Sequence, residues 1–203
     1  MGYSIIDNKV AYWETPKCAS RTVMGYGYLL RYPESYINSS EMFLSNNYTY
    51  AKIRKESKKW MKNTDDYPIR FCVVRDPVDR FISAFSNRIL FRRMIPSGMK
   101  INIHSFIETF DNPEYYEAYT DIKHHLLSQV YYLGNNPDFY THIFNMSQIN
   151  SLKSLIEENS GVRLPELTLN VSDKSSKPWI SPSEIQWIKD KFKKDYEIYG
   201  KWM

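Results

Sequence analysis

A nearly continuous apolar segment, Ile69 to Val74 (IRFCVV), is the feature that most constrains how this chain of 203 residues folds. A strand that is apolar at almost every position is typical of a parallel sheet, because helices cover both of its faces. Arg75, Asp76 and Pro77 follow, and Pro77 suits the first turn of a helix. The segment therefore predicts a buried central strand that runs directly into a helix.

Strands and helices alternate along the rest of the chain. Two further strands are expected at residues 9–15 and 140–146, which are rich in aromatic and β-branched side chains. Helices are expected over 23–31, 52–62, 103–110, 122–133 and 148–158, after Pro77 as far as Leu90, and after a capping box at 181–184 as far as Tyr199. Residues 96–98 and 163–180 have the composition of loops. This order predicts a single α/β domain over residues 1–203, with a mainly parallel central sheet flanked by helices.

The charge balance favours an anionic ligand. Twenty-seven Lys and Arg residues against 23 Asp and Glu give a formal charge of +4, which does not require a nucleic-acid partner, and none is expected. Hydrophobic residues at 42% and charged residues at 25% exclude disordered and collagen-like classes. Aromatic residues make up 16% of the chain, and we expect most of them in the core, with a platform for sugar rings as the alternative.

The ends of the chain and its cysteines limit its location and its cofactors. No apolar stretch approaches the length of a membrane-spanning helix, which is about 18–20 residues, so no membrane span is expected. The first residues lack the basic and apolar segments of a signal peptide. Cys18 and Cys72 form neither a disulfide framework nor a metal-binding spacing. We therefore expect a cytoplasmic location and no bound metal.

Two of the expected strand ends carry residues suited to phosphate. Ligands of open α/β sheets bind at the carboxyl ends of the strands. Residues 15–22 (TPKCASRT) join a strand to a helix and offer backbone amides, hydroxyl groups and two cations to an anion. At the carboxyl end of the second strand, the apolar segment 69–74, Arg75 follows directly and Ser83 lies eight residues later. The sequence thus predicts a P-loop-like phosphate site, although residues 15–22 lack the glycines of a Walker A loop.

These segments resemble motifs of the PAPS-dependent sulfotransferases, most closely the carbohydrate branch in its soluble bacterial or viral form. TPKCASRT resembles the loop that binds the 5′-phosphosulfate of PAPS (3′-phosphoadenosine 5′-phosphosulfate). Residues 74–85 (VRDPVDRFISAF) resemble the strand and helix that bind the 3′-phosphate. Residues 125–129 (HLLSQ) keep the His and Gln of a His-Trp-x-Pro-Gln-like motif, and residues 170–172 (NVS) and 195–200 (DYEIYG) match two later motifs of that branch. In order, the motifs span residues 9–200.

The resemblance implies roles for individual residues. Lys17 is the expected catalytic cation, since an ammonium group beside the bridging oxygen stabilises the negative charge that grows there in the transition state. Arg75 and Ser83 are expected to bind the 3′-phosphate, which suits the planar guanidinium group. Asp76 and Arg80 are expected to pair with each other or to cap the helix. The 5′-phosphosulfate is expected on Lys17, Cys18, Ala19, Ser20, Arg21 and Thr22.

A general base must also take the proton of the acceptor hydroxyl, and histidine suits this task near neutral pH. His125 matches the histidine segment of the family and is the expected base. His124 and a carboxylate such as Glu14 remain alternatives. Of the other histidines, His104 precedes an apolar helix and His142 lies in an expected strand.

The sequence therefore predicts an enzyme that moves a sulfuryl group from PAPS to a hydroxyl acceptor by direct in-line displacement, leaving PAP and using no metal. The expected acceptor is a glycan or another hydroxyl-bearing molecule, and a homo-oligomer is possible because the chain is short for the family. A small ATP-dependent P-loop kinase is one alternative, against which the absent Walker A pattern argues. A non-catalytic module that binds nucleotides, or acidic glycans through the basic segment 52–62, is the other.

Overall fold

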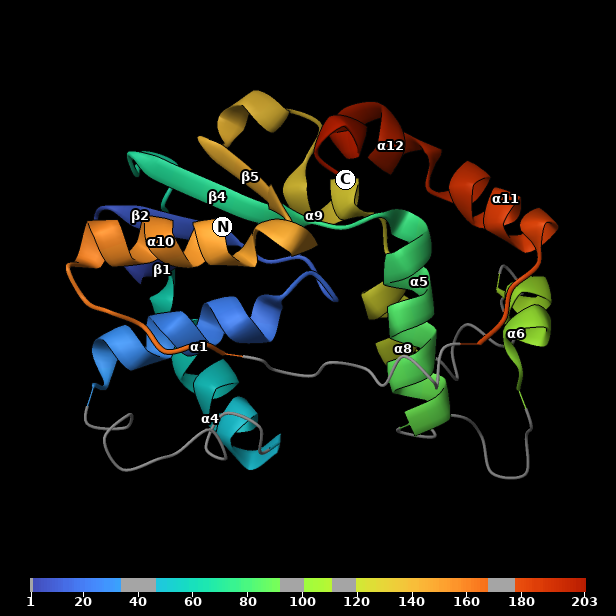
Figure 1. Cartoon of the computed structure of the whole chain (residues 1–203), viewed down its shortest axis with the longest axis horizontal. Helices are drawn as coiled ribbons and strands as arrows, with labels where there is room; N and C mark the ends of the chain where they lie inside the picture. Colours follow the sequence, from blue (N-terminus) through green and yellow to red (C-terminus); the bar gives the residue numbers. More distant parts are fainter. Residues whose placement is uncertain (1, 34–46, 92–100, 111–119, 168–177) are drawn as a thin grey trace.

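In the computed structural model, which describes residues 2–33, 47–91, 101–110, 120–167 and 178–203, the fold is built on a single sheet (Figure 1). Three adjacent strands at one side of the sheet pair in parallel, and β1 is antiparallel to both of its neighbours. Four of the five described strands therefore run in one direction, which confirms the predicted α/β fold with a mainly parallel sheet. The order is β3-β1-β2-β4-β5, formed by β1 (Gly2–Ile6), β2 (Val10–Trp13), β3 (Met61–Lys62), β4 (Ile69–Val74) and β5 (His142–Asn145).

Helices cover both faces of the sheet, and a second group of helices extends beyond it. The longer described helices are α1 (Ser20–Arg31), α4 (Asn47–Ser57), α5 (Pro77–Phe85), α6 (Ile103–Thr109), α8 (Thr120–Leu126), α9 (Gln129–Leu133), α10 (Ile149–Ser160), α11 (Pro182–Lys191) and α12 (Lys193–Tyr199). Short helical segments are η1 (Lys58–Trp60), η2 (Ser86–Phe91), η3 (Pro137–Phe139), η4 (Met146–Gln148) and η6 (Gly200–Trp202). Figure 1 shows α5, α6, α8 and α11 to the right of the sheet, where they share a hydrophobic core of their own.

Strand β4 explains why its segment is apolar at nearly every position. Phe71 and Val73 pack on one face of the sheet in the core shared with α1 and α10. Cys72 and Val74 point to the opposite face, in the core shared with α9 and α12. All four side chains have no exposed surface, as expected for a strand whose alternate residues face two buried layers.

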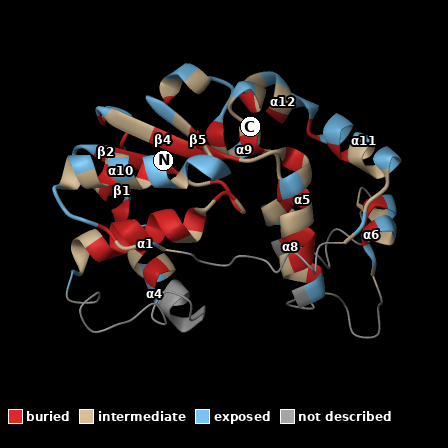
Figure 2. Cartoon of the chain, in the orientation of Figure 1, coloured by how far each residue is buried: buried red, intermediate tan, exposed pale blue. Residues whose placement is uncertain are grey.

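Helix α1 is buried along most of its length, between the sheet and α4 (Figure 2). Gly27 allows this close packing: a Cβ atom there would lie 3.2 Å from Ile5 of β1 and 3.3 Å from Trp60 of η1. The burial fixes the position of α1, and its N-terminus points to the loop that follows β2.

Several element boundaries differ from the prediction. Strand β1 is not among the predicted elements, and the helix predicted over 52–62 ends at Ser57, because the last two residues pair with β1 as strand β3. The single helix predicted over 122–133 is wrong: Ser128 interrupts it and accepts a hydrogen bond from the backbone N–H of Tyr131, so that α9 starts anew. The C-terminal helix likewise breaks at Phe192 into α11 and α12, whereas its capping box at Ser181 is confirmed. The loop predicted at 96–98, the motif at 170–172 and much of the loop at 163–180 lie outside the described residues.

Candidate functional site

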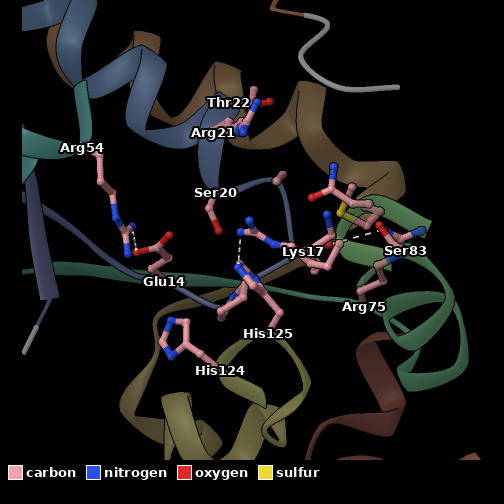
Figure 3. A pocket seen from close by; sticks show the side chains of 15 residues that line it. Glu14, Lys17, Ser20, Arg21, Thr22, Arg54, Arg75, Ser83, His124 and His125 are labelled. Atoms are coloured by element: carbon pink, nitrogen blue, oxygen red, sulfur yellow. Dashed lines mark hydrogen bonds and ion pairs between the residues drawn. The ribbon is translucent and has the colours of Figure 1, made fainter. Parts of the chain in front are cut away.

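A cavity of about 330 Å³ lies at the carboxyl ends of the three parallel strands. Glu14 follows β2, Arg75 follows β4 and Met146 follows β5, and all three residues line it. Figure 3 shows Arg54 and Glu14 at one end, Arg75 and Ser83 at the other, and the two histidines along one side. The structure brings into this cavity the predicted residues Lys17, Ala19, Ser20, Arg21, Thr22, Arg75, Ser83 and His125, with the alternatives Glu14 and His124.

The loop between β2 and α1 has a backbone shape suited to an anion. Lys17 and Ala19 both have left-handed backbone conformations, with φ values of 69° and 54°. Such conformations strain residues other than glycine, and they aim successive N–H groups into a concavity that binds anions. Ala19 is also the N-cap of α1 and has no side-chain acceptor for the amides of the first turn. The end of this helix therefore suits an external anion.

The same loop is held in place by the carbonyl of Thr15. The Ser20 hydroxyl donates to this carbonyl at 2.8 Å, and the backbone N–H of Cys18 donates to it at 3.3 Å. The Ser20 hydroxyl thus stabilises the loop from inside, while the residue also lines the cavity.

Cys18 is the one predicted site residue that does not line the cavity. Its thiol is fully buried, 3.6 Å from the Oε1 of Gln129 and 3.8 Å from the carbonyl of Pro16. Burial raises the pKa of this thiol to about 11, so it stays protonated at neutral pH. The side chain of Cys18 attaches the loop to the core and does not face a ligand in the cavity.

Arg75 and Ser83 meet at one end of the cavity because β4 leads directly into α5. Asp76 caps this helix: its carboxylate accepts from the backbone N–H groups of Val78 and Asp79, which confirms the predicted cap. The guanidinium group of Arg75 donates to the carbonyl of Lys17 at 3.3 Å. This contact joins the end of β4 to the loop after β2.

Arg80 neither pairs with Asp76 nor caps α5, so that expectation is corrected. Its side chain is 1% exposed, and its guanidinium group donates to three backbone carbonyls, those of Pro16, His125 and Leu127. Two of these carbonyls lie at the C-terminal end of α8, where a cation is favoured. Arg80 thus ties the histidine segment to the loop after β2.

His125 lies at the end of α8 and turns toward the cavity. Its Nε2 contacts a guanidinium nitrogen of Arg88. Burial, and then the positive charge of Arg88 and Lys17, lower the pKa of His125 to about 3. The imidazole is therefore neutral at pH 7, and beside these cations its ring is a weak base.

Three charged or polar residues of the cavity are absent from the sequence prediction. Arg54 of α4 reaches inward and forms an ion pair with Glu14, although Lys52, Lys55 and Lys58 of the same segment are exposed. Asn87 and Arg88 lie one turn after Ser83, in the π-helical segment η2 that continues α5. The position of Ser83 was the signal that could have identified these two residues, since they extend the same side of the helix.

Charge dominates the cavity. Lys17, Arg21, Arg54, Arg75 and Arg88 line it, with Glu14 as the single carboxylate among the described lining residues. This excess of cations favours a ligand with several negative charges.

The other two histidines lie elsewhere. His104 is part of α6, and its Nδ1 contacts the carboxylate of Glu184 in α11. His142 is exposed at the start of β5. In the described part of the chain, no group of three or more His, Cys, Asp or Glu side chains is placed to hold a metal ion. Nor does any described helix have the length and apolar character to cross a membrane.

The model of the sulfotransferase family matches residues 6–201 of the chain. No curated protein and no solved structure matches the chain. The matched region includes every described residue that lines the cavity, from Glu14 to Met146. The chain therefore belongs to the sulfotransferase family, whose members transfer sulfuryl groups.

Proposed function

We propose that this sulfotransferase takes its sulfuryl group from PAPS and transfers it to a hydroxyl group, with a carbohydrate as the acceptor. The observation that carries the proposal is that one cavity contains two separate groups of cations and hydrogen-bond donors. The loop at Lys17–Thr22 suits the 5′-phosphosulfate, and Arg75 with Ser83 suits the 3′-phosphate. The hydrogen bond from Arg75 to the Lys17 carbonyl keeps the two groups in register.

The residues present fit a doubly phosphorylated nucleotide. The left-handed backbone at Lys17 and Ala19 and the first turn of α1 provide amide donors at one end. A guanidinium and a hydroxyl group provide donors at the other end, in Arg75 and Ser83. PAPS supplies the sulfuryl group: the bond from sulfur to the 5′-phosphate oxygen breaks while a bond from the acceptor oxygen to sulfur forms, and PAP keeps the electron pair.

Lys17 stabilises the charge that develops on the 5′-phosphate oxygen. Lys17 lines the cavity and belongs to the loop that we assign to this phosphate, which supports this role. Because the charge is larger in the transition state than in the ground state, Lys17 accelerates the reaction more than it strengthens binding.

His125 accepts the proton of the acceptor hydroxyl at its imidazole ring. Its pKa is about 3, because burial and the nearby cations disfavour the charged ring. A polyanion among these cations offsets their charge and makes the ring more basic. The base thus becomes effective when the donor is in place.

The carbohydrate acceptor rests on the sequence similarity at 125–129 and 195–200. A phosphoryl-transfer function is disfavoured by the chemistry of the cavity: its one described carboxylate, Glu14, is already paired with Arg54, and magnesium prefers carboxylate oxygens. As for the aromatic residues, most described tyrosines are buried, and Tyr131 and Trp179 are exposed enough to meet a sugar ring.

Ligand preference tests the assignment of the donor. PAP is expected to raise the melting temperature of the protein more than ADP, AMP or ATP does, because it alone carries the 3′-phosphate that Arg75 is placed to bind. In Arg75→Ala this preference should vanish, while stabilisation by AMP remains. Equal stabilisation of the wild-type protein by ADP and PAP would contradict the 3′-phosphate assignment.

The titration of His125 tests its coupling to the donor. We expect its pKa to rise from about 3 when PAP binds, because the phosphate charges oppose the effect of Arg88 and Lys17. The measurement is an NMR titration of labelled imidazole rings with and without PAP. The signal of His142, at the opposite end of β5 from Met146, serves as an internal reference that PAP should not move. If PAP leaves the pKa of His125 unchanged, the proposed coupling between His125 and the donor is wrong.

A further inference from the structure

Gln129 does not line the cavity, yet its side chain holds the backbone of Arg75. Its Oε1 accepts a hydrogen bond from the Arg75 N–H at 3.0 Å, and its Nε2 donates to the Arg75 carbonyl at 2.8 Å. Both backbone polar groups of Arg75 are therefore bound by one amide group. Gln129 has no exposed surface, so these hydrogen bonds are not readily replaced by bonds to solvent.

Asp195 of α12 holds Gln129 in turn. Its two carboxylate oxygens accept from the backbone N–H groups of Gln129 and Val130, at 2.9 and 3.0 Å. Asp195 is also without exposed surface. Since these two N–H groups begin α9, the carboxylate determines where this helix starts and hence where the side chain of Gln129 lies.

The amide of Gln129 also touches the other anion-binding segment. The thiol of Cys18 lies 3.6 Å from the same Oε1 that accepts from Arg75. One buried side chain therefore contacts both the loop after β2 and the end of β4, the two segments that supply the proposed donor site.

We propose that Gln129 and Asp195 are positioning residues for the 3′-phosphate end of the donor site. Neither residue touches the ligand; Asp195 fixes Gln129, and Gln129 fixes the backbone from which the Arg75 side chain reaches the cavity. This inference rests on the proposed function, because Arg75 binds a 3′-phosphate only if the donor is PAPS. It accounts for the glutamine of the HLLSQ segment and the aspartate of the DYEIYG segment without giving either a role in the reaction.

The test compares two ligands that differ only in the 3′-phosphate. Dissociation constants for PAP and AMP are measured by calorimetry for the wild-type protein, Gln129→Met and Asp195→Asn. Methionine keeps the length of the glutamine side chain and removes both hydrogen bonds to Arg75. We expect Gln129→Met to weaken PAP binding about tenfold and to leave AMP binding unchanged. Asp195→Asn keeps one acceptor oxygen, so it should weaken PAP binding less than Gln129→Met does and should also leave AMP binding unchanged. Asp195→Asn serves as the test if Gln129→Met does not fold.

A double variant separates positioning from a general loss of stability. If Gln129 acts through Arg75, Gln129→Met combined with Arg75→Ala should bind PAP no more weakly than Arg75→Ala alone. Tyr199→Phe is the matched control: it removes one partly buried hydrogen bond of α12, from the Tyr199 hydroxyl to the Gly134 carbonyl at 2.9 Å, and should leave the ratio of PAP to AMP affinity unchanged.

The possible results distinguish this inference from the proposed function. If Gln129→Met loses affinity for PAP and AMP equally, Gln129 has only a structural role. The same conclusion follows if the losses of PAP affinity in Gln129→Met and Arg75→Ala add fully in the double variant. A preference for PAP that survives in both Gln129→Met and Asp195→Asn would overturn this inference alone. A wild-type protein without any preference for PAP over AMP would overturn the proposed donor, and the inference with it.

Discussion

Replacing Lys17 by alanine is expected to lower kcat for sulfuryl transfer by about 100- to 1,000-fold, the size of effect seen when one donor to a developing oxyanion is removed. Binding of PAP should change far less, because the other donors of the loop and of Arg75 remain. The assay is transfer from PAPS to a carbohydrate acceptor, with PAP affinity measured in parallel by calorimetry. Loss of kcat with retained affinity is the signature of an interaction made mainly in the transition state.

The conformation of Lys17 calls for two control variants. Its backbone is left-handed, with φ of 69°, and asparagine tolerates this conformation better than alanine. Lys17→Asn should lose activity to the same degree as Lys17→Ala, which separates the missing charge from backbone strain. Lys17→Met keeps the length of the side chain without its charge and should also be inactive. Turnover close to that of the wild-type protein in Lys17→Met would remove this ammonium group from the mechanism.

Arg80→Met is expected to lower the free energy of unfolding by about 3 kcal/mol, since one buried and two partly buried carbonyls lose their donor and each unsatisfied buried group costs roughly 1–3 kcal/mol. These carbonyls belong to Pro16, His125 and Leu127, so the loss falls where the histidine segment meets the loop. Urea unfolding followed by circular dichroism measures the change.

Arg163, an exposed arginine, provides the matched control for this substitution. Arg163→Met should change the free energy of unfolding by no more than about 0.5 kcal/mol, as is usual for an exposed position. A change of that small size in Arg80→Met would mean that the three carbonyls find other partners and that Arg80 does not hold the two segments together.

The elements that sequence reasoning placed correctly carry strong local signals. Residues 69–74 are apolar enough to require a strand covered on both faces, and Asp76-Pro77 marks the start of α5 through an acceptor side chain and a residue that suits the first turn. The break inside 122–133 was missed because the apolar spacing continues across it. The Ser128 cap, together with the contact of Asp195 with the first amides of α9, shows why a new helix begins at Gln129.

For the candidate site, the limit of prediction lies in the contacts between distant segments. Lys17, Arg75 and Ser83 were identified because each belongs to a motif at a strand end. Arg54 belongs to a segment of basic residues that are mostly exposed, and its inward direction depends on how α4 packs against α1. The hydrogen bonds of the buried Arg80 side chain depend likewise on the tertiary fold, because its three acceptors are 45 to 64 residues away along the chain.

The separation along the chain of Arg75, Gln129 and Asp195 has a consequence for folding. Gln129 lies 54 positions after Arg75 and 66 positions before Asp195, so long loops must close before these contacts form. We therefore expect the donor site to form late, after β4, α5 and their local contacts. A collapsed intermediate with native-like helices would then bind no nucleotide, so that recovery of PAP binding after dilution from urea would follow the last step of folding and not the first.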